Sequence, residues 1–297
     1  MKSEIMRQKI LFIVNPKSGT LSKTNWISMA TRMLAKDFDL EFKYTTHRGH
    51  ACELAQQAVA DHVPIVAAVG GDGTVNEIAS SLVDSDTALA ILPLGSGNGL
   101  ARELGLSPLL QLNAISCIKR LKFKQIDYGR VNDVPFFCTC GVGFDAQIAY
   151  EVTQRKRRGL WMYVSLCIHE FFHYKPLECT LHYDGKTETH KAFVVNCANI
   201  RQFGFNAYIA PRADMADDRL NITILKPFGF WTALRLLAGL FTKRLDHFKK
   251  YVETFECERI TIETTQKTPF HCDGDYIGLS DHVEVEVVPH ALKVAIP

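Results

Sequence analysis

The sequence lacks an excess of charge of either sign. Its 297 residues carry 34 Lys and Arg against 32 Asp and Glu, a formal net charge of +2 at pH 7. Proteins that bind nucleic acid usually concentrate positive charge, so nucleic acid is not expected as a partner. A low-complexity segment typical of disorder is also missing, and the hydrophobic share of 47% is ample for a packed core.

Paired cysteine motifs and long apolar runs are scarce too. Nine cysteines at irregular spacing, without a CxxC pair, are typical of reduced intracellular thiols. Packing is the favoured role for Cys138 and Cys140, because no second Cys/His pair completes a zinc site. The apolar run at residues 10–14 is too short for a signal peptide, and the run at 228–242 carries Arg235 and is too short to span a bilayer. We therefore expect a cytoplasmic protein that associates with a membrane only transiently.

Residues 1–125 repeat one theme, a short apolar strand followed by a turn and an amphipathic helix. Apolar runs at residues 9–14, 65–69 and 88–92 are typical of parallel strands buried on both faces. Apolar residues recur at helical spacing within 26–34, 51–59 and 75–83. The pattern predicts a doubly wound α/β domain over residues 1–125.

After residue 125 the hydrophobic pattern alternates instead. Residues 177–183 alternate and run into Asp184-Gly185, a hairpin signal, and residues 220–224 and 283–287 alternate as well. This pattern predicts an antiparallel β-sandwich-like domain over residues 126–290, interrupted by helices near 160–173 and 230–242. The last apolar run can pair in either domain, so residues 291–297 are a candidate for a return to the first one.

Three Gly-bearing turns follow the predicted parallel strands. The segment GGDGT at residues 70–74 follows one strand and opens a helix, which makes it a candidate anion site. Asp72 would repel phosphate unless a cation intervenes, so its carboxylate is a candidate Mg²⁺ ligand or proton acceptor. The other turns are NPKSG at residues 15–19, with Lys17, and PLGSGNG at residues 93–99, with Asn98.

Open α/β sheets bind ligands at the carboxyl ends of their strands, where all three turns are expected. A lone Gly-rich turn often only connects a strand to a helix, but three together favour a polyphosphate site. The usual phosphate motifs are absent. A Walker A loop would need Gly where Thr180 stands, and the glycines at 95, 97 and 99 do not form GxGxxG.

These segments resemble the diacylglycerol kinase catalytic-domain superfamily. It includes bacterial soluble lipid kinases, sphingosine kinases and ceramide kinases, and is more distantly similar to NAD kinases and 6-phosphofructokinases. The resemblance implies an ATP-dependent lipid kinase, with a lipid substrate and a peripheral membrane surface as partners; a homodimer is left open. The resemblance covers nearly the whole chain in order: residues 15–19, 70–77, 93–102, 126–129, 141–146, 211–221 and 273–275.

The resemblance also implies site residues. Mg²⁺ is expected in the loop at residues 211–220, bound by the carboxylate of Asp217 and the backbone carbonyls of Asp214 and Arg219. The family usually has Gly where Asp218 stands, and a solvated acidic loop is the alternative. ATP is expected to contact Asn15, Pro16, Lys17, Ser18, Gly19, Thr45, Gly70, Gly71, Asp72, Gly73, Thr74, Val75, Asn76 and Ser96.

The proposed general base of the family is usually Glu in Asp-Gly-Glu, where this chain has DGD at residues 273–275. Asp275 is therefore the candidate base, one methylene shorter, and Asp72 is its rival. The Asp-Gly pair is also an ordinary hairpin signal. Asp127 and Asp145 are candidate supporting acids, or caps of local turns.

Gly99 stands where many bacterial diacylglycerol kinases have Asp, which looks more like sphingosine and long-chain-base kinases. This favours a sphingoid base without deciding against diacylglycerol. Two segments are candidates for membrane contact, RKRR at 155–158 with the aromatic residues after it, and residues 228–241 with the basic pair after them. Each is alternatively a core-facing helix.

Two other functions remain open. One is a kinase of a soluble acceptor such as NAD. The other is a nucleotide- or lipid-binding protein without catalysis, motivated by Gly99, Asp218 and Asp275.

Overall fold

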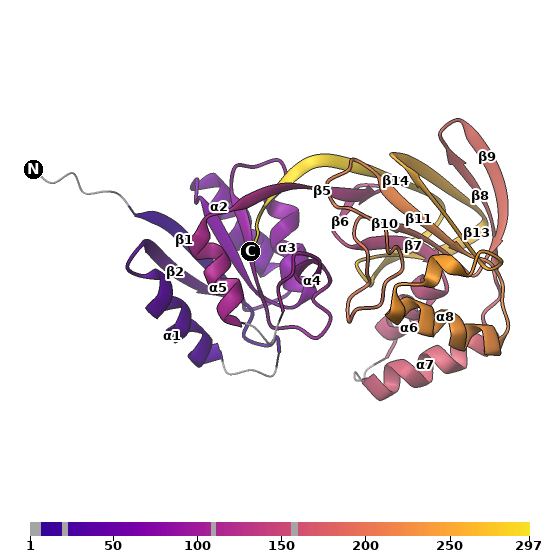
Figure 1. Cartoon of the computed structure of the whole chain (residues 1–297), viewed down its shortest axis with the longest axis horizontal. Coiled ribbons are helices and arrows are strands. Elements are labelled where there is room, and N and C mark those ends of the chain that lie inside the picture. The colour runs from indigo at the N-terminus through magenta and orange to yellow at the C-terminus, as the bar shows by residue number, and fades with distance from the viewer. Residues whose placement is uncertain (1–6, 20–22, 108–110, 156–159) are drawn as a thin grey trace, which may run out of the picture. The chain divides into compact units, whose positions relative to one another are not determined.

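The computed structural model describes residues 7–19, 23–107, 111–155 and 160–297, which fall into two compact units (Figure 1). Unit 1 contains the chain up to Ile126 together with His290–Pro297, and unit 2 contains Asp127–Pro289. The chain passes from one unit to the other within β5 (Phe123–Val131) and again within β14 (Asp275–Ala295).

Unit 1 is built on a parallel sheet. Its strands pair in the order β2-β1-β3-β4, and every one of these pairings is parallel. β3 and β4 are buried throughout, as their continuous apolar sequences predict. The strands are β1 (Gln8–Val14), β2 (Phe38–Tyr44), β3 (Ile65–Gly70) and β4 (Ala88–Pro93).

Helices alternate with these strands along the chain. The helix α1 packs against α5, and α2 packs against α3. The predicted doubly wound α/β domain is confirmed, although β2 and α5 had no clear pattern in the sequence. The helices are α1 (Lys23–Leu34), α2 (His50–Ala60), α3 (Asp72–Leu82), α4 (Gly99–Glu103) and α5 (Gln111–Arg120).

The end of β14 returns to unit 1. Val294 lies opposite Leu89 of β4 in parallel register, and the N–H of Asp84 donates a hydrogen bond to the carbonyl of Ala291 at 2.8 Å. The side chains of Leu292 and Val294 are fully buried. The sequence left open whether the last apolar run pairs with the first or the second domain. In the structure it pairs with unit 1.

Unit 2 is an antiparallel β structure. Its strands follow the order β12-β11-β10-β7-β13-β14, and β8 and β9 form a hairpin that also pairs with β13. β13 pairs with β8 at residues 261–264 and with β7 at residues 270–272, and its pairing with β14 shifts register between Glu263 and Thr268. The bounds are β6 (Val134–Phe136), β7 (Thr139–Gly143), β8 (Leu177–Tyr183), β9 (Lys186–Ala192), β10 (Val194–Ala198), β11 (Leu220–Leu225), β12 (Val252–Cys257) and β13 (Arg259–Cys272).

Two details of unit 2 follow from its sequence. The residues of the β8–β9 turn, Asp184 and Gly185, have φ values of 47° and 72°, as the predicted two-residue hairpin requires. Alternating residues of β8, β13 and β14 point into one core, so the sandwich-like prediction is confirmed.

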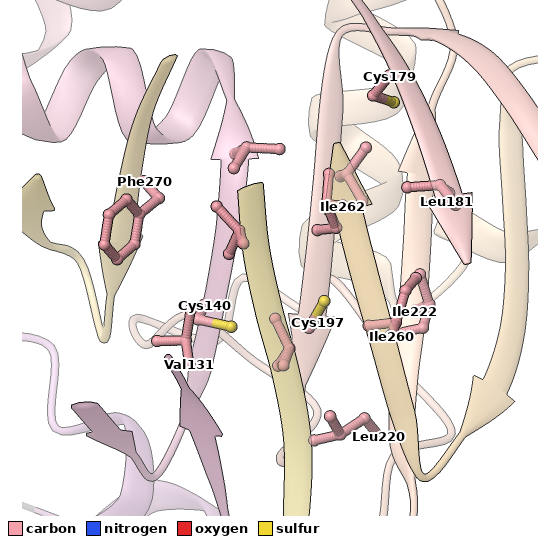
Figure 2. Close-up of a cluster of buried hydrophobic side chains, with 14 of the residues drawn as sticks. Val131, Cys140, Cys179, Leu181, Cys197, Leu220, Ile222, Ile260, Ile262 and Phe270 are labelled. Atoms are coloured by element: carbon pink, nitrogen blue, oxygen red, sulfur yellow. The ribbon is translucent and has the colours of Figure 1, made fainter. Parts of the chain in front are cut away.

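The core of unit 2 contains thiols as well as aliphatic side chains (Figure 2). Cys140 on β7 lies opposite both Cys197 of β10 and Cys272 of β13 in the strand register. Burial raises the pKa of the Cys140 thiol well above its ordinary value. All nine cysteines are free, and the packing role predicted for Cys140 is confirmed.

Three helices of unit 2 lie together beside its strands: α6 (Phe144–Thr153), α7 (Leu160–His173) and α8 (Phe230–Thr242) (Figure 1). A short 3-10 turn, η1 (Leu245–His247), follows α8. Each of α7 and α8 has a core-facing side and an exposed apolar side: Leu166 and Leu236 are buried, whereas Trp161 is 85% and Trp231 77% exposed. No described helix has the length and apolar character needed to cross a membrane.

Candidate active site

Three loops emerge at one edge of the unit 1 sheet. They follow β1, β3 and β4, and because these parallel strands are neighbours, their carboxyl ends lie side by side. The N–H of Asn15 donates to the carbonyl of Val69 at 3.0 Å, and the N–H of Leu94 donates to the carbonyl of Gly70 at 2.8 Å. The backbone therefore joins each loop to its neighbour.

Asp72 links the second loop to the third. Its Oδ2 accepts a hydrogen bond from the N–H of Asn98, and its Oδ1 accepts one from the N–H of Gly99, both at 2.7 Å. Gly99 is the first residue of α4, so the carboxylate satisfies N–H groups that a helix start leaves without an acceptor. This bidentate contact was not foreseen from the sequence, because its partners lie 26 and 27 residues away.

Glycine allows the second and third loops to touch. A Cβ atom on Gly95 would lie 2.6 Å from the Cα of Gly71, which is shorter than the non-bonded distances that Cβ atoms keep in proteins. Gly19 has a φ of 68°, and a Cβ there would lie 2.2 Å from the carbonyl oxygen of Leu94. The spacing of the three loops therefore depends on residues without side chains.

Asn15 joins the first loop to the second. Its Nδ2 donates to Oγ1 of Thr74 at 3.0 Å, and its Oδ1 accepts from the N–H of Lys17 at 2.9 Å. The hydroxyl of Ser18 donates to the carbonyl of Asn15 at 3.0 Å. At the end of β2, the N–H of Thr45 donates to the carbonyl of Val14 at 2.9 Å.

The sequence-predicted ATP residues thus gather at one edge of unit 1. Pro16, Lys17 and Gly19 are exposed on the first loop, Ser96 is exposed on the third, and residues 72–76 form the start of α3. Their contacts with ATP stay predictions.

The loops fit a polyphosphate. Gly71 is the N-cap of α3 and no side-chain hydrogen bond caps this helix start, so its first N–H groups have no side-chain acceptor and suit an anion. A Cβ on Gly73 would meet no atom within 4 Å, which leaves space in front of the helix. The exposed ammonium group of Lys17 adds positive charge at the same edge.

The predicted metal loop lies in unit 2 and is held by Asp127. This buried carboxylate accepts the N–H of Asp218 at 2.9 Å, and the N–H of Asp127 donates to the carbonyl of Met215 at 2.7 Å. Asp218 has a φ of 61°, a left-handed conformation that Asp tolerates better than most residues. The turn therefore forms although Asp replaces the usual Gly.

Asp217 is the acidic centre of this loop. Partial burial raises the pKa of its carboxyl group above the ordinary value, and the nearby carboxylate of Asp214 adds to the rise. The N–H of Arg219, which donates to Oδ1 of Asp217 at 3.1 Å, acts in the opposite direction. Oxygen donors in an acidic environment fit a hard cation such as Mg²⁺, although metal binding by these residues stays a prediction.

The two acids of the DGD segment occupy different environments. Asp273 accepts three backbone N–H groups, from Phe137, Cys138 and Thr139, at 2.9, 2.7 and 3.0 Å. With Gly274 it forms the tight turn between β13 and β14, at φ values of 49° and 85°. Asp275, the candidate base, is the first residue of β14 and is exposed.

A His–Asp pair close to this hairpin was missed in the sequence. Nε2 of His271 lies 3.1 Å from Oδ2 of Asp145, whose Oδ1 accepts the N–H of Ala146 at 2.8 Å. His271 is buried and pairs with Tyr276 across the hairpin that carries Asp275. The partners are 126 residues apart, so no local spacing could have predicted the contact.

Comparison with known families gives the geometry a context. Residues 9–131 match the model of the diacylglycerol kinase catalytic domain, and residues 138–296 match that of the YegS C-terminal NAD kinase beta sandwich-like domain. The chain belongs to the diacylglycerol kinase catalytic-domain superfamily. Its two family matches follow one another along the sequence with a gap of only a few residues.

Members of this superfamily cover nearly the whole chain. The diacylglycerol kinase of Bacillus subtilis (strain 168) is 24% identical over 96% of this chain and 95% of its own length. A Chromohalobacter salexigens protein named "Probable lipid kinase YegS-like" is 28% identical over 96% of this chain and 92% of its own. The crystal structure of a Bacillus anthracis diacylglycerol kinase has a TM-score of 0.75 at 22% identity, over 98% of this chain and 97% of that one, and supports the fold.

Proposed function

We propose that the protein transfers the γ-phosphoryl group of ATP to a hydroxyl group of a membrane lipid, with Mg²⁺ as the metal. The observation that carries the proposal is the set of three linked loops in unit 1, in a chain that belongs to a family with lipid kinases. The acceptor class is a diacylglycerol or a sphingoid base; Gly99 favours the sphingoid base.

The chain's own groups have separable roles in this proposal. The N–H groups at the start of α3 and the ammonium group of Lys17 bind phosphate oxygens, and Asp72 holds the second and third loops together. The carboxylate of Asp217 and the backbone carbonyls of Asp214 and Arg219 would hold Mg²⁺, and the metal would supply positive charge to offset that of phosphate oxygens.

Asp275 is the group that we assign as general base. The lipid oxygen forms a bond to the γ-phosphorus, the bond from that phosphorus to the departing ADP breaks, and the hydroxyl proton passes to Asp275. An exposed carboxylate suits this role better than that of Asp72, whose two oxygens both accept backbone N–H groups.

Membrane contact is assigned to α7 and α8. Each helix exposes one apolar stripe, and the stripes meet where the ring of Phe172 stacks on that of Phe230 with centroids 5.6 Å apart. Exposed apolar stripes that include tryptophan are typical of helices that lie in the bilayer interface. The stripes are Trp161, Val164, Ile168 and Phe172 on α7, and Phe230, Trp231, Leu234, Leu237 and Phe241 on α8. Residues 156–158 of the predicted basic segment lie outside the described residues.

The deciding experiment incubates the purified protein with labelled ATP, Mg²⁺ and mixed micelles of diacylglycerol, sphingoid base or ceramide, with NAD as a soluble acceptor in a parallel reaction. We expect label in a lipid phosphate, and the lipid that gains it identifies the substrate class. Label in NAD would instead identify a kinase of a soluble acceptor. ATP binding without label in any acceptor would identify a non-catalytic binding protein.

A further inference from the structure

Two edge strands of unit 2, β9 and β12, lie next to one another. Among the described residues, β9 pairs with β8 alone and β12 pairs with β11 alone, so no ladder of backbone hydrogen bonds joins the two edges. The ring of Tyr183 on β8 stacks on that of Phe255 on β12, with centroids 4.1 Å apart. This stack brings the β8–β9 hairpin against β12, and the contact between these edges is made by side chains.

Ionisable side chains occupy inward positions at these two edges. Residues directly opposite one another in an antiparallel pair point to the same face of the sheet. Glu188 and His190 on β9 each lie opposite a core residue of β8, and Glu253 on β12 lies opposite a core residue of β11. All three side chains therefore face the interior of the sandwich, at positions where a strand usually carries an apolar residue.

The three side chains converge closely enough to share an ion. One ligand atom from each of Glu188, His190 and Glu253 lies within 4.8 Å of the other two. Nε2 of His190 lies 3.4 Å from Oε2 of Glu188, and it is buried without a hydrogen-bond partner among the described residues. Two ligands bound tetrahedrally to zinc at about 2.0–2.1 Å are about 3.3 Å apart. The spacing of this pair therefore suits zinc.

Both carboxylates have partners that orient them. Burial, a hydrogen bond to Glu188 and the negative charges of Glu188 and Glu253 raise the pKa of Tyr183 to about 12, so its hydroxyl stays a donor at neutral pH. Nζ of Lys226 lies 2.9 Å from Oε2 of Glu253. Because a carboxylate offers two oxygens, each acid can keep this partner and still bind a metal. Outer partners of this kind are typical of metal ligands.

We propose that Glu188, His190 and Glu253 bind a Zn²⁺ ion that joins β9 to β12. Imidazole is a ligand that zinc accepts well and Mg²⁺ does not favour, which separates this site from the all-oxygen loop of Asp217. Three protein ligands leave one position of a tetrahedral ion for water. The ion stabilises unit 2 by linking two strands that backbone pairing leaves apart. This inference goes beyond the proposed kinase reaction and does not depend on it.

The test is calorimetric titration of the metal-free full chain with Zn²⁺, in a buffer with millimolar Mg²⁺ that occupies oxygen-only sites. Loss of an outer partner of a metal ligand costs about 10- to 100-fold in affinity, so we expect His190→Gln and Glu253→Gln each to lose at least about 100-fold. Tyr183→Phe keeps the ring stack and should lose about 10- to 100-fold. The controls, His62→Asn and Glu178→Gln, alter exposed positions and should bind Zn²⁺ like the wild type.

Thermal unfolding gives a second readout. Zn²⁺ at 100 times its dissociation constant should raise the unfolding midpoint of the wild type by about 5–10 °C, and the same concentration should leave that of His190→Gln unchanged. Three results would overturn the proposal: no Zn²⁺ binding by the full chain, equal affinities in His190→Gln and His62→Asn, or loss of the Zn²⁺ signal in millimolar Mg²⁺. Equal affinities would mark adventitious binding by surface histidines, and loss in Mg²⁺ would mark an oxygen-only site.

Discussion

Aspartates that bind backbone N–H groups shape both candidate sites. Asp72 fixes the start of α4 in unit 1, and Asp273 fixes the segment that leads into β7 in unit 2. A hydrogen bond to a charged group stabilises by about 1.5–3 kcal/mol, so each contact is strong enough to determine how a loop is placed. An aspartate in a motif can therefore be essential without touching a substrate.

Replacing Asp72 by Asn tests this positioning role. The amide keeps one acceptor oxygen but turns an NH₂ group toward the second backbone N–H, so the link between the loops weakens. We expect KM for ATP to rise and kcat/KM for ATP to fall about 10- to 100-fold, from the loss of one hydrogen bond to a charged group. Steady-state kinetics with varied ATP measure both constants. A lost kcat at unchanged KM would instead place Asp72 among the reacting groups. Asp86→Asn, at an exposed position before β4, is the control and should match the wild type.

Substitutions of Asp275 and Asp273 should separate an effect on turnover from an effect on stability. For Asp275→Asn we expect turnover to fall by about 10²- to 10⁴-fold, the usual contribution of a general base, at an unchanged unfolding midpoint. For Asp273→Asn we expect a lower free energy of unfolding, by about 1.5–3 kcal/mol, because three N–H groups lose a charged acceptor. Turnover assays and urea denaturation of both variants decide the matter. Near-normal turnover of Asp275→Asn would remove it as the base.

At the scale of elements, the three loops were predictable because each follows a continuous apolar run and contains glycine. The helices α7 and α8 were also expected from the sequence, near residues 160–173 and 230–242. The sequence could not show that their large apolar side chains face outward, since the same amphipathic stripe suits a core or a membrane. Contacts between distant segments, such as His271 with Asp145, depend on strand register and helix placement, which no local pattern encodes.

The contact between the second and third loops predicts unequal effects of two alanine substitutions. Gly95→Ala would bring a Cβ to 2.6 Å from the Cα of Gly71, so the loops must separate. We expect a lower thermal unfolding midpoint and weaker ATP binding, measured by calorimetry. Gly73→Ala is the stability control, because its Cβ meets no atom within 4 Å and the midpoint should stay unchanged. Equal midpoints in the two variants would contradict the close approach of the loops.

The exposed stripe of α8 predicts a difference between two leucines of similar exposure. Leu237 on α8 is 51% exposed and Leu112 on α5 is 56% exposed, so replacing either by Ser costs little in folding. Leu237→Ser should weaken sedimentation with phospholipid vesicles by about 5- to 50-fold, as about 1–2.5 kcal/mol of apolar transfer is lost. Leu112→Ser should sediment like the wild type. Equal behaviour of the two would remove α8 from the membrane contact.

At the scale of the whole molecule, the chain crosses between its units twice, so unit 1 is completed only by the last residues of the sequence. Leu292, Val294 and Ala295 are buried in unit 1, while the preceding part of the same strand belongs to unit 2. Unit 1 thus depends on a segment far from it in sequence. Contacts of this separation slow folding, because the intervening loop must close first.

This dependence predicts that a change near the carboxyl terminus destabilises the amino-terminal part of the chain. The three tryptophans allow a local readout, since Trp26 is buried in unit 1 and the other two belong to unit 2. In a Trp161→Phe/Trp231→Phe background, Leu292→Ala should lower the free energy of unfolding reported by Trp26 fluorescence by about 2–5 kcal/mol, the range for a buried leucine. The control is Leu279→Ala on the same strand, 53% exposed in unit 2, which should leave the Trp26 transition in place. An unchanged transition in Leu292→Ala would mean that unit 1 is stable without the end of β14.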